Sequence, residues 1–546
     1  MPPILPTPTR PFTMHIPAEI LEKIFSHLVL PGFYEGGVYR PHPEGAISRG
    51  TLTALARSDK RFNKVATDCL YGQTVVLNSP RTFFLFLRTI VGDDELAEVV
   101  RVLWIPSCPW RKSRGGDAIS IAKSESIIAA ITSDQQAHRY LVRCFGDPAE
   151  AANFTPRNRQ AQFGQSACCL LFCLTSNVET LSMALAWDSR AYLDGQQGIC
   201  AFFNACDSQQ EEPFLLLPSL RSLSLFAQGD EDNCTYSLCC LAAKWYAAFL
   251  GSGTIKHLEL DEPDMGCNGF RREKLGAVES LRCTSSLWLL GDSLLAVYQA
   301  ARPPLRILDV TCSVYGFFMG PRRTLLGESL ERFGRTLEKL RLRIQDCERC
   351  LVFDTGLVPR LARFEHVREL VISVALLFSS SQAMESTDIC TVLPTSLEKV
   401  RFDEIYYKHC GFWGCEQEPS PNHGDDDTVR NRHGYRPRQV IMNERARVLA
   451  IYRLLLKRDF LRLLSDSRDS LPRLHTVEVA MIKDESSWSF GEEVEEWLKL
   501  LPAGGSCLGT TAITTALGAG RYNPDRGRMV EVETVCYTTM QASKSN

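Results

Sequence analysis

The sequence predicts an α/β protein in which a small helical module precedes a long solenoid of strands and helices. Apolar residues recur at helical spacing over roughly the first seventy residues. From residue 100 a six-residue pattern recurs, with apolar residues at its first, fourth and sixth places. The chain has 546 residues, more than the roughly 250–300 at which a single hydrophobic core stops growing. Several domains or a repeat array are therefore expected.

The first helix is predicted within the segment from Ile16 to Leu28. Pro17 suits the first helical position, Glu19 favours the helix dipole in the first turn, and Pro31-Gly32 ends the helix. Its apolar residues follow the spacing i, i+1, i+4, i+5, i+8, and they are Ile20, Leu21, Ile24, Phe25 and Leu28. This spacing places them on one stripe.

Two more short helices complete the predicted module. One covers Thr51 to Arg57, and Ser58-Asp59 can cap the next. The apolar stripe of the third helix consists of Phe62, Val65, Ala66, Cys69 and Leu70. Three short helices form only a small core, and such a module often keeps an apolar face for a partner. The alternative is a helical cap that buries this face against its own chain.

These residues resemble a known family. Ile-Pro-x-Glu-Ile-Leu-x-x-Ile-Phe-x-x-Leu, from residue 16, is similar to the opening of the F-box, which usually begins Leu-Pro. Leu52-x-x-Leu55-Ala56, Phe62-x-x-Val65-Ala66 and Leu70-Tyr71 resemble its second half, with Phe62 where a Trp is usual. The resemblance implies an F-box over residues 12–75 that docks onto the Skp-type adaptor of an SCF (Skp–cullin–F-box) ubiquitin ligase. The adaptor-binding residues that it implies are Ile16, Pro17, Ile20, Leu21, Ile24, Phe25, Leu28, Leu52, Leu55 and Phe62.

One segment departs from the family. Between the first two helices the chain has Val29 to Gly50, rich in Gly and Pro, where the family has a few residues. A surface loop of this length adds little closure entropy, so the fold can accommodate it. The loop could obstruct the adaptor groove, and it therefore bears on docking and not on folding.

A linking segment with a helix is predicted over residues 76–99, and a repeat array over 100–482. The starts from residue 220 to residue 397 are 35, 23, 27, 32, 30 and 30 residues apart, near the period of a strand-plus-helix repeat. Such triplets occur by chance in about a tenth of all windows, so the spacing is the better evidence. The copies are Val100–Ile105, Val178–Met183, Leu220–Leu225, Ile255–Leu260, Val278–Cys283, Leu305–Val310, Leu337–Leu342, Val367–Ile372, Leu397–Phe402 and Leu474–Val479.

The array resembles a degenerate set of leucine-rich repeats, a common continuation after an F-box. It lacks the Asn or Cys expected three places after each core, where Ser313, Gln345 and Ala375 stand. The turns must therefore be stabilised in another way, and repeat number and curvature stay open. The alternative is an irregular α/β domain with a mixed sheet.

Two further segments interrupt or end the array. Residues 403–447 have a Gly-Pro-Asn-Asp bias that predicts a flexible insertion. Residues 483–546 are expected to hold a capping helix, around Val494 to Leu501, and a polar tail.

No motif indicates an enzyme. A nucleophile elbow, phosphate loop, HExxH or dinucleotide fingerprint is missing from the sequence. The potential metal ligands of the insertion match no structural zinc spacing, and they are His409, Cys410, Cys415, His423 and His433. We therefore expect no metal, no cofactor and no catalytic residue, with a metal-dependent enzyme as a remote alternative.

Charge and cysteine content favour an intracellular protein-binding role. A formal net charge of −3 provides no global field for nucleic acid or an anionic membrane. The 21 cysteines lack framework spacing, as expected for reduced thiols. The start of the chain has no signal-peptide pattern. We expect a cytoplasmic or nuclear protein, or one found in both compartments.

In a solenoid, alternate strand positions face outward on the concave side. Four arginines at such positions, Arg306, Arg341, Arg368 and Arg401, could read an acidic or phosphorylated segment. The sequence thus predicts the substrate-recognition subunit of an SCF-type ligase, which binds a Skp-type adaptor, through it a cullin, and an unknown protein substrate. The alternative is a repeat scaffold that enters no ligase.

Overall fold

The computed structural model divides the chain into two compact units, Met1–Cys234 and Thr235–Asn546, and each is described by itself. The residues that it describes are 17–28, 33–35, 38–40, 44–72, 74–105, 168, 170–186, 217–228, 253–261, 272–313, 326–346, 357–377, 386–403, 457–459, 461–463, 470–482, 512–523 and 528–538.

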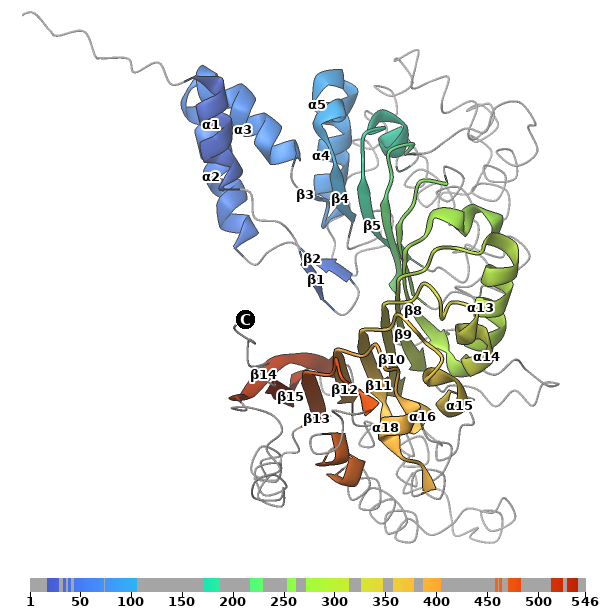
Figure 1. Cartoon of the computed structure of the whole chain (residues 1–546). Helices are drawn as coiled ribbons and strands as arrows, with labels where there is room; N and C mark the ends of the chain where they lie inside the picture. The colour runs from blue at the N-terminus through green and yellow to red at the C-terminus, as the bar shows by residue number, and fades with distance from the viewer. Residues whose placement is uncertain are drawn as a thin grey trace, which may run out of the picture. The chain divides into compact units, whose positions relative to one another are not determined.

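The first unit begins with three helices, α1 (Ala18–Ser26), α2 (Gly45–Ser58) and α3 (Lys60–Gly72) (Figure 1). Pro17 is the residue before the first turn of α1, with φ −57° and ψ 149°, one position earlier than the predicted first helical position. The helices share a small core in which the rings of Phe25 and Phe62 meet edge to face, with centroids 6.0 Å apart. The buried members of this core are Leu21, Phe25, Leu52, Val65 and Ala66. Its identity as an F-box stays a prediction.

The long loop between α1 and α2 contains an antiparallel hairpin. Its strands are β1 (Phe33–Glu35) and β2 (Val38–Arg40), and β2 contacts β6 (Ser222–Gln228) of the same unit. The hydroxyl of Ser48 donates to the carbonyl oxygen of Leu28 and joins the two ends of the loop. The sequence predicts only a loop here, because strands of three residues are too short to show periodicity.

The helical module continues directly into the first strands through β3 (Thr74–Val76), α4 (Pro80–Val91) and α5 (Asp94–Val99). Ser79 caps α4: the amide of Thr82 donates to the Ser79 hydroxyl over 3.2 Å, and Pro80 occupies the first turn. The ring of Tyr71 stacks on that of Phe86 in α4, at 5.8 Å. The predicted linking segment with a helix, residues 76–99, thus holds two helices, and β3 ends at its first residue.

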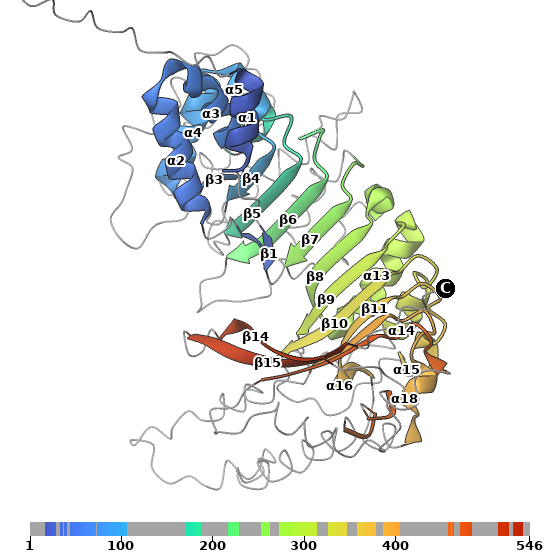
Figure 2. The same ribbon diagram turned by 60° about the vertical axis from the view of Figure 1, so that its left-hand side comes forward.

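The strands of the first unit are parallel. β4 (Val102–Ile105) pairs with β3 on one side and with β5 (Thr180–Ala186) on the other, and β5 pairs with β6. Figure 2 shows these strands side by side next to the helices. Parallel neighbours need a crossover connection, so each strand starts a new structural repeat.

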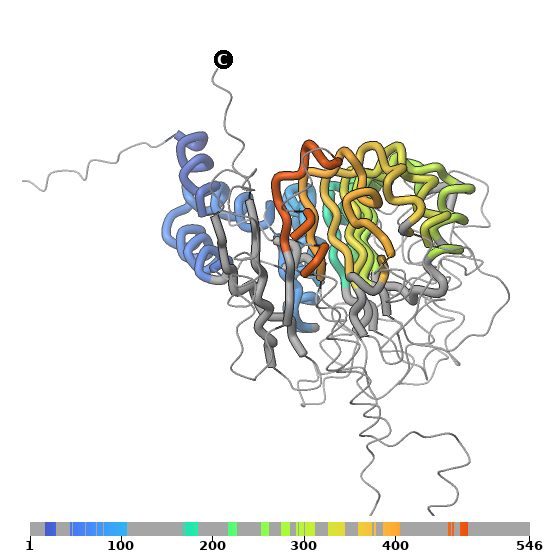
Figure 3. The backbone as a smooth tube through the Cα atoms, turned by 60° about the horizontal axis from the view of Figure 1, so that its bottom comes forward, coloured from blue at the N-terminus to red at the C-terminus, as the bar shows by residue number. Residues whose placement is uncertain are grey.

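The second unit continues the same arrangement. Each parallel strand pairs with the next one along the chain, and the strands are β7 (His257–Asp261), β8 (Ser280–Ser286), β9 (Ile307–Ser313), β10 (Lys339–Asp346), β11 (Glu369–Ser373), β12 (Lys399–Asp403) and β13 (Thr476–Ile482). Short helices connect them, seen beside the strands in Figure 3: η1 (Arg272–Ala277), α13 (Leu287–Ala301), α14 (Leu326–Glu331), α15 (Val358–Leu361), α16 (Val374–Leu377) and α18 (Ile389–Val392).

The end of the second unit differs from the prediction. β15 (Arg528–Thr538) pairs antiparallel with β13, and β14 (Ala512–Asn523) pairs with β15, where the sequence predicts a polar tail. The alternation Val530-Glu-Val532-Glu is the signal for a strand that this prediction missed. The predicted capping helix around Val494 lies outside the described residues, as does the insertion 403–447 beyond Asp403.

The repeating apolar pattern forms the core of both units. Every copy that the sequence predicts contributes one parallel strand, from β4 to β13. The side chains at the first, fourth and sixth places are buried in every copy, with at most 8% exposed at Leu474, wherever the structure describes their burial. The α/β class and the parallel, solenoid-like stacking are therefore confirmed. The name leucine-rich repeat stays a prediction.

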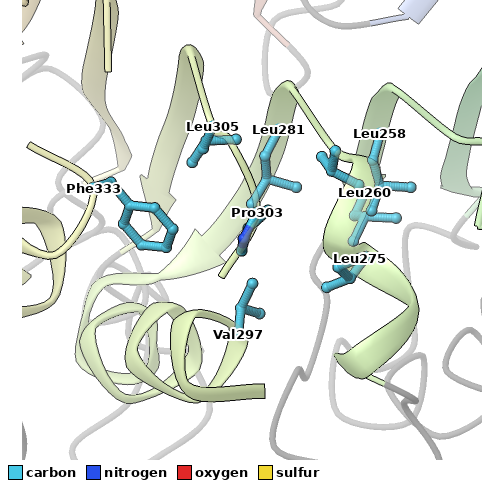
Figure 4. Close-up of a pocket in the computed structure, with 9 residues that line it drawn as sticks. Leu258, Leu260, Leu275, Leu281, Val297, Pro303, Leu305 and Phe333 are labelled. Atoms are coloured by element: carbon cyan, nitrogen blue, oxygen red, sulfur yellow. The ribbon is translucent and has the colours of Figure 1, made fainter. Parts of the chain in front are cut away.

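The packing leaves little free space in this core. Between β7, β8, β9 and α13, nine apolar residues surround a void of about 10 Å³ (Figure 4). A void of that size is at the lower limit for one water molecule, and its lining offers no polar atom to hold one. It is a packed interface between repeats and not a ligand pocket.

We predict that Leu340→Ala destabilises the array strongly. Leu340 is fully buried at the fourth place of its copy, so the truncation leaves a cavity and should cost about 2–5 kcal/mol of unfolding free energy. Urea denaturation followed by circular dichroism measures this change. The neighbouring Lys339→Ala, with a side chain 46% exposed, should change it by less than about 1 kcal/mol. Equal effects of the two variants would contradict the assigned face.

Candidate protein-interaction surfaces

Helix α1 presents two large apolar side chains to solvent. Ile20 is 48% exposed and Ile24 is 49% exposed, and their i, i+4 spacing places them on one face. Leu21 and Phe25, one position further in each turn, are buried in the core of the module. The stripe predicted from the sequence therefore splits into a core side and an open side.

The other predicted adaptor-binding residues divide in the same way. Leu52 is fully buried, and Leu28, Leu55 and Phe62 pack against the module core while they stay partly exposed. Pro17 is exposed, and Ile16 lies outside the described residues. Pro17, Ile20 and Ile24 are therefore the predicted residues that a partner can reach without disturbing the core.

One exposed apolar residue of the module is missing from the prediction. Ile47, in the first turn of α2, is 73% exposed. The sequence prediction places Ile47 in the loop because it starts the helix at Thr51. In the structure α2 begins at Gly45, six residues earlier. An isolated Ile in a Gly-rich stretch gives no periodic signal, so sequence reasoning had no means of finding it.

A row of alternating charges marks the second position of successive repeats in the second unit. We call it the charge row; its members, from β7 to β12, are Lys256, Glu279, Arg306, Glu338, Arg368 and Glu398. Neighbours within it form ion pairs: Lys256 with Glu279 at 2.9 Å, and Arg306 with Glu338 at 2.9 Å. A hydrogen bond and the charge of Lys256 lower the pKa of Glu279, and Arg306 does the same to Glu338. The row is thus internally neutralised.

Arg341 is the centre of a second group of charges on the outward face of β8–β11. Its Nε donates to Oε1 of Glu369 over 3.2 Å, and its Nη1 lies 3.7 Å from Oδ2 of Asp309. Arg282 reaches the same Asp309 oxygen at 3.1 Å, and Lys339 reaches Glu369 at 3.1 Å. Burial alone would raise the pKa of Glu369, but hydrogen bonds and charges from Arg341 and Lys339 outweigh it, so this pKa lies below its ordinary value.

Arg401 extends this network over the last parallel strands. Its Nε donates to Asp403 over 2.8 Å, and Glu478 on β13 lies 4.0 Å from its Nη1. Lys399 holds the other oxygen of Glu478 at 2.7 Å. The strand register places Val371 between Arg341 and Arg401, and Val371 is only 3% exposed although it belongs to the outward face. The long arginine stems cover apolar surface there.

All four arginines of the predicted substrate surface are thus engaged by carboxylates of their own chain. Glu338 occupies the planar fork of Arg306 with two hydrogen bonds, 2.9 and 3.0 Å long. Arg368 has the loosest contact, 3.7 Å from Glu398, and its side chain is 62% exposed. An acidic ligand would have to displace carboxylates at the other three. Ligand binding by these four residues stays a prediction.

The described residues hold no group of three or more His, Cys, Asp or Glu side chains that could bind a metal ion. The potential ligands of the insertion, His409 to His433, lie outside these residues. Among the described helices, none has the length and apolar character needed to cross a bilayer. The features on which a functional proposal can rest are therefore the open side of α1 and the outward strand face.

Comparison with known proteins adds no identity. No family model matches the sequence, and no curated protein is similar to it.

We predict that Arg341→Ala lowers the urea midpoint of unfolding at neutral pH and makes this midpoint less dependent on pH in the acidic range. Asp309 is 6% exposed and loses one of its two cations, which should cost about 1–3 kcal/mol. The pKa of Glu369 is depressed in the folded state, so its contribution is fully present above the ordinary value of 4.5 and declines as the pH falls through the folded pKa. The variant should therefore lose less stability than the wild type between pH 7 and pH values below 4.5. Parallel pH profiles of the two proteins would contradict this.

Proposed function

We propose that this chain is the substrate-recognition subunit of an SCF-type ubiquitin ligase. The helical module holds a Skp-type adaptor and, through it, a cullin, while the repeats hold a protein substrate. The observation that carries the proposal is the pair Ile20 and Ile24, each about half exposed on a helix whose other large apolar residues, Leu21 and Phe25, are buried. A module that served only as a cap would bury this pair against its own chain.

The architecture suits an adaptor that performs no chemistry itself. Tyr71, in the last turn of α3, stacks on Phe86 of α4, so the module packs against the helix that follows β3. Transfer of ubiquitin by other subunits then depends on proximity, because a substrate held in place meets the active site at a high effective concentration. A joined module and strand array limits the positions that such a substrate can take.

The hairpin β1–β2 bears on the question of docking. Its strand β2 contacts β6, so this part of the long loop is held on the strands of its own unit. Ile20 and Ile24 on α1 are each about half exposed. This supports adaptor binding despite the length of the loop.

The second candidate is a repeat scaffold that enters no ligase. The charge row favours this candidate, because paired charges along a strand face provide a rigid surface with no catalytic group. The two candidates differ in one property, which is capture of a Skp-type adaptor.

We predict that the purified full chain binds a Skp-type adaptor and that Ile20→Asp with Ile24→Asp abolishes binding. Two charges at the centre of an apolar interface should weaken binding by about a hundredfold or more. Both side chains are about half exposed, so the circular dichroism spectrum and melting temperature should stay near those of the wild type. Calorimetric titration with the adaptor measures the affinity.

Leu85→Asp is the matched control. Leu85 is 42% exposed on α4, outside the helical module, so the same charge should leave adaptor affinity unchanged. Wild-type protein that binds no adaptor would favour the scaffold. A double variant that binds the adaptor as the wild type does would contradict docking through Ile20 and Ile24.

A further inference from the structure

Three exposed arginines stand on the turns that lead into β9 and β10. We call Arg302, Arg332 and Arg335 the arginine edge. Arg302 follows α13, and the other two lie between α14 and β10. Within the part of the chain that the structure describes, no carboxylate forms an ion pair with any of them. In this they differ from the four paired arginines of the strand face.

These turns are neighbours in space. Pro303 and Phe333, each next to a member of the arginine edge in the sequence, line the same apolar void (Figure 4). The ring of Tyr298 in α13 meets that of Phe333 edge to face, with centroids 5.3 Å apart. β9 and β10 are paired strands, so the chains that enter them run side by side. The backbone positions of the three arginines therefore belong to neighbouring turns.

The acidic side chains nearby do not neutralise this region. Glu331 is held by Arg363 at 2.6 Å and by Arg360 at 3.1 Å, and Glu338 is held by Arg306. Glu365, an exposed carboxylate in the turn before β11, forms no ion pair with the arginine edge in the described part of the chain. The arginine edge thus carries a local positive charge on a chain whose formal net charge is −3.

The backbone of Arg302 provides an independent observation. Its φ is +45°, a left-handed conformation that favours glycine and is costly for a residue with a side chain. The position ends α13, where its amide donates to the carbonyl oxygen of Tyr298 over 3.0 Å. Residues held in such conformations concentrate at functional sites. Arg302 therefore occupies a position where glycine would be less strained.

We propose that the arginine edge binds an acidic segment of a partner protein. Guanidinium groups without a carboxylate partner can offer their planar forks to Asp or Glu side chains, in charge-assisted and often bidentate contacts. Three such groups fit a short acidic segment, and the negative net charge of the whole chain disfavours an extended polyanion such as nucleic acid. The inference rests on the proposed function to the extent that this partner is the recruited substrate.

Fluorescence anisotropy with the full-length chain tests the proposal. The probe is a labelled short peptide of alternating glutamate and serine, compared with one of alternating lysine and serine. We expect binding of the acidic peptide alone, weakened by added salt. Arg302→Gly with Arg335→Ala should reduce its affinity by about tenfold or more. Because glycine suits the left-handed position, Arg302→Gly should leave the melting temperature unchanged or higher.

Arg221→Ala is the matched control, an exposed arginine before β6 in the first unit, and it should bind the acidic peptide as the wild type does. No binding at low salt would overturn the proposal, as would an unchanged affinity of the double variant or an equal loss in the control. A single-stranded oligonucleotide that binds more tightly than the peptide, and loses binding in the same variants, would also overturn it. No adaptor is present in the assay, so failed adaptor capture contradicts only the proposed function.

Discussion

Burial of the apolar triplet in each repeat is the constraint on which the rest of the structure depends. A strand that carries apolar residues at the fourth and sixth places has one dry face and cannot be stable alone. Parallel stacking on a neighbour with the same apolar pattern buries this face continuously, and the buried first place fixes where each strand begins. The register between neighbours is therefore set by the core, since a slip of one residue would expose every apolar side chain.

The charges follow from this register. Residues at equal places in neighbouring strands lie about 4.8 Å apart, a distance at which like charges repel and unlike charges attract. The charge row alternates in sign from Lys256 to Glu398, and Asp309 stands between Arg282 and Arg341. These residues thus pair along the outward face. The arginine edge lies instead on the turns, where the core does not impose a neighbour. That is why the arginine edge, and not the strand face, is the better candidate for an acidic ligand.

The periodic features of the chain were predictable from sequence, and the pairings were not. The recurring apolar triplet located the ten strands from Val100 onward, and the helical stripe located α1. The sequence could not show that Ile20 stays open while Leu21 is buried, because both residues belong to one stripe and the tertiary contacts of α2 and α3 decide between them. The carboxylate partners of Arg341 and the contact of β2 with β6 depend on residues distant in the chain, which a single sequence does not reveal. The sequence predicts a polar tail where the final hairpin lies, because the Gly-rich stretch gives no periodic signal for a strand.

Amide hydrogen exchange, followed by mass spectrometry, tests most directly whether the stacked triplets organise the array. If burial of the fourth and sixth places holds successive strands together, peptides that cover β9, β10, β11 and β12 should exchange several orders of magnitude more slowly than an unfolded chain. They should also lose this protection together as urea is added, because each strand completes the core of its neighbours. Exchange of these strands at the unfolded rate, or loss of protection in one of them long before the others, would contradict the account.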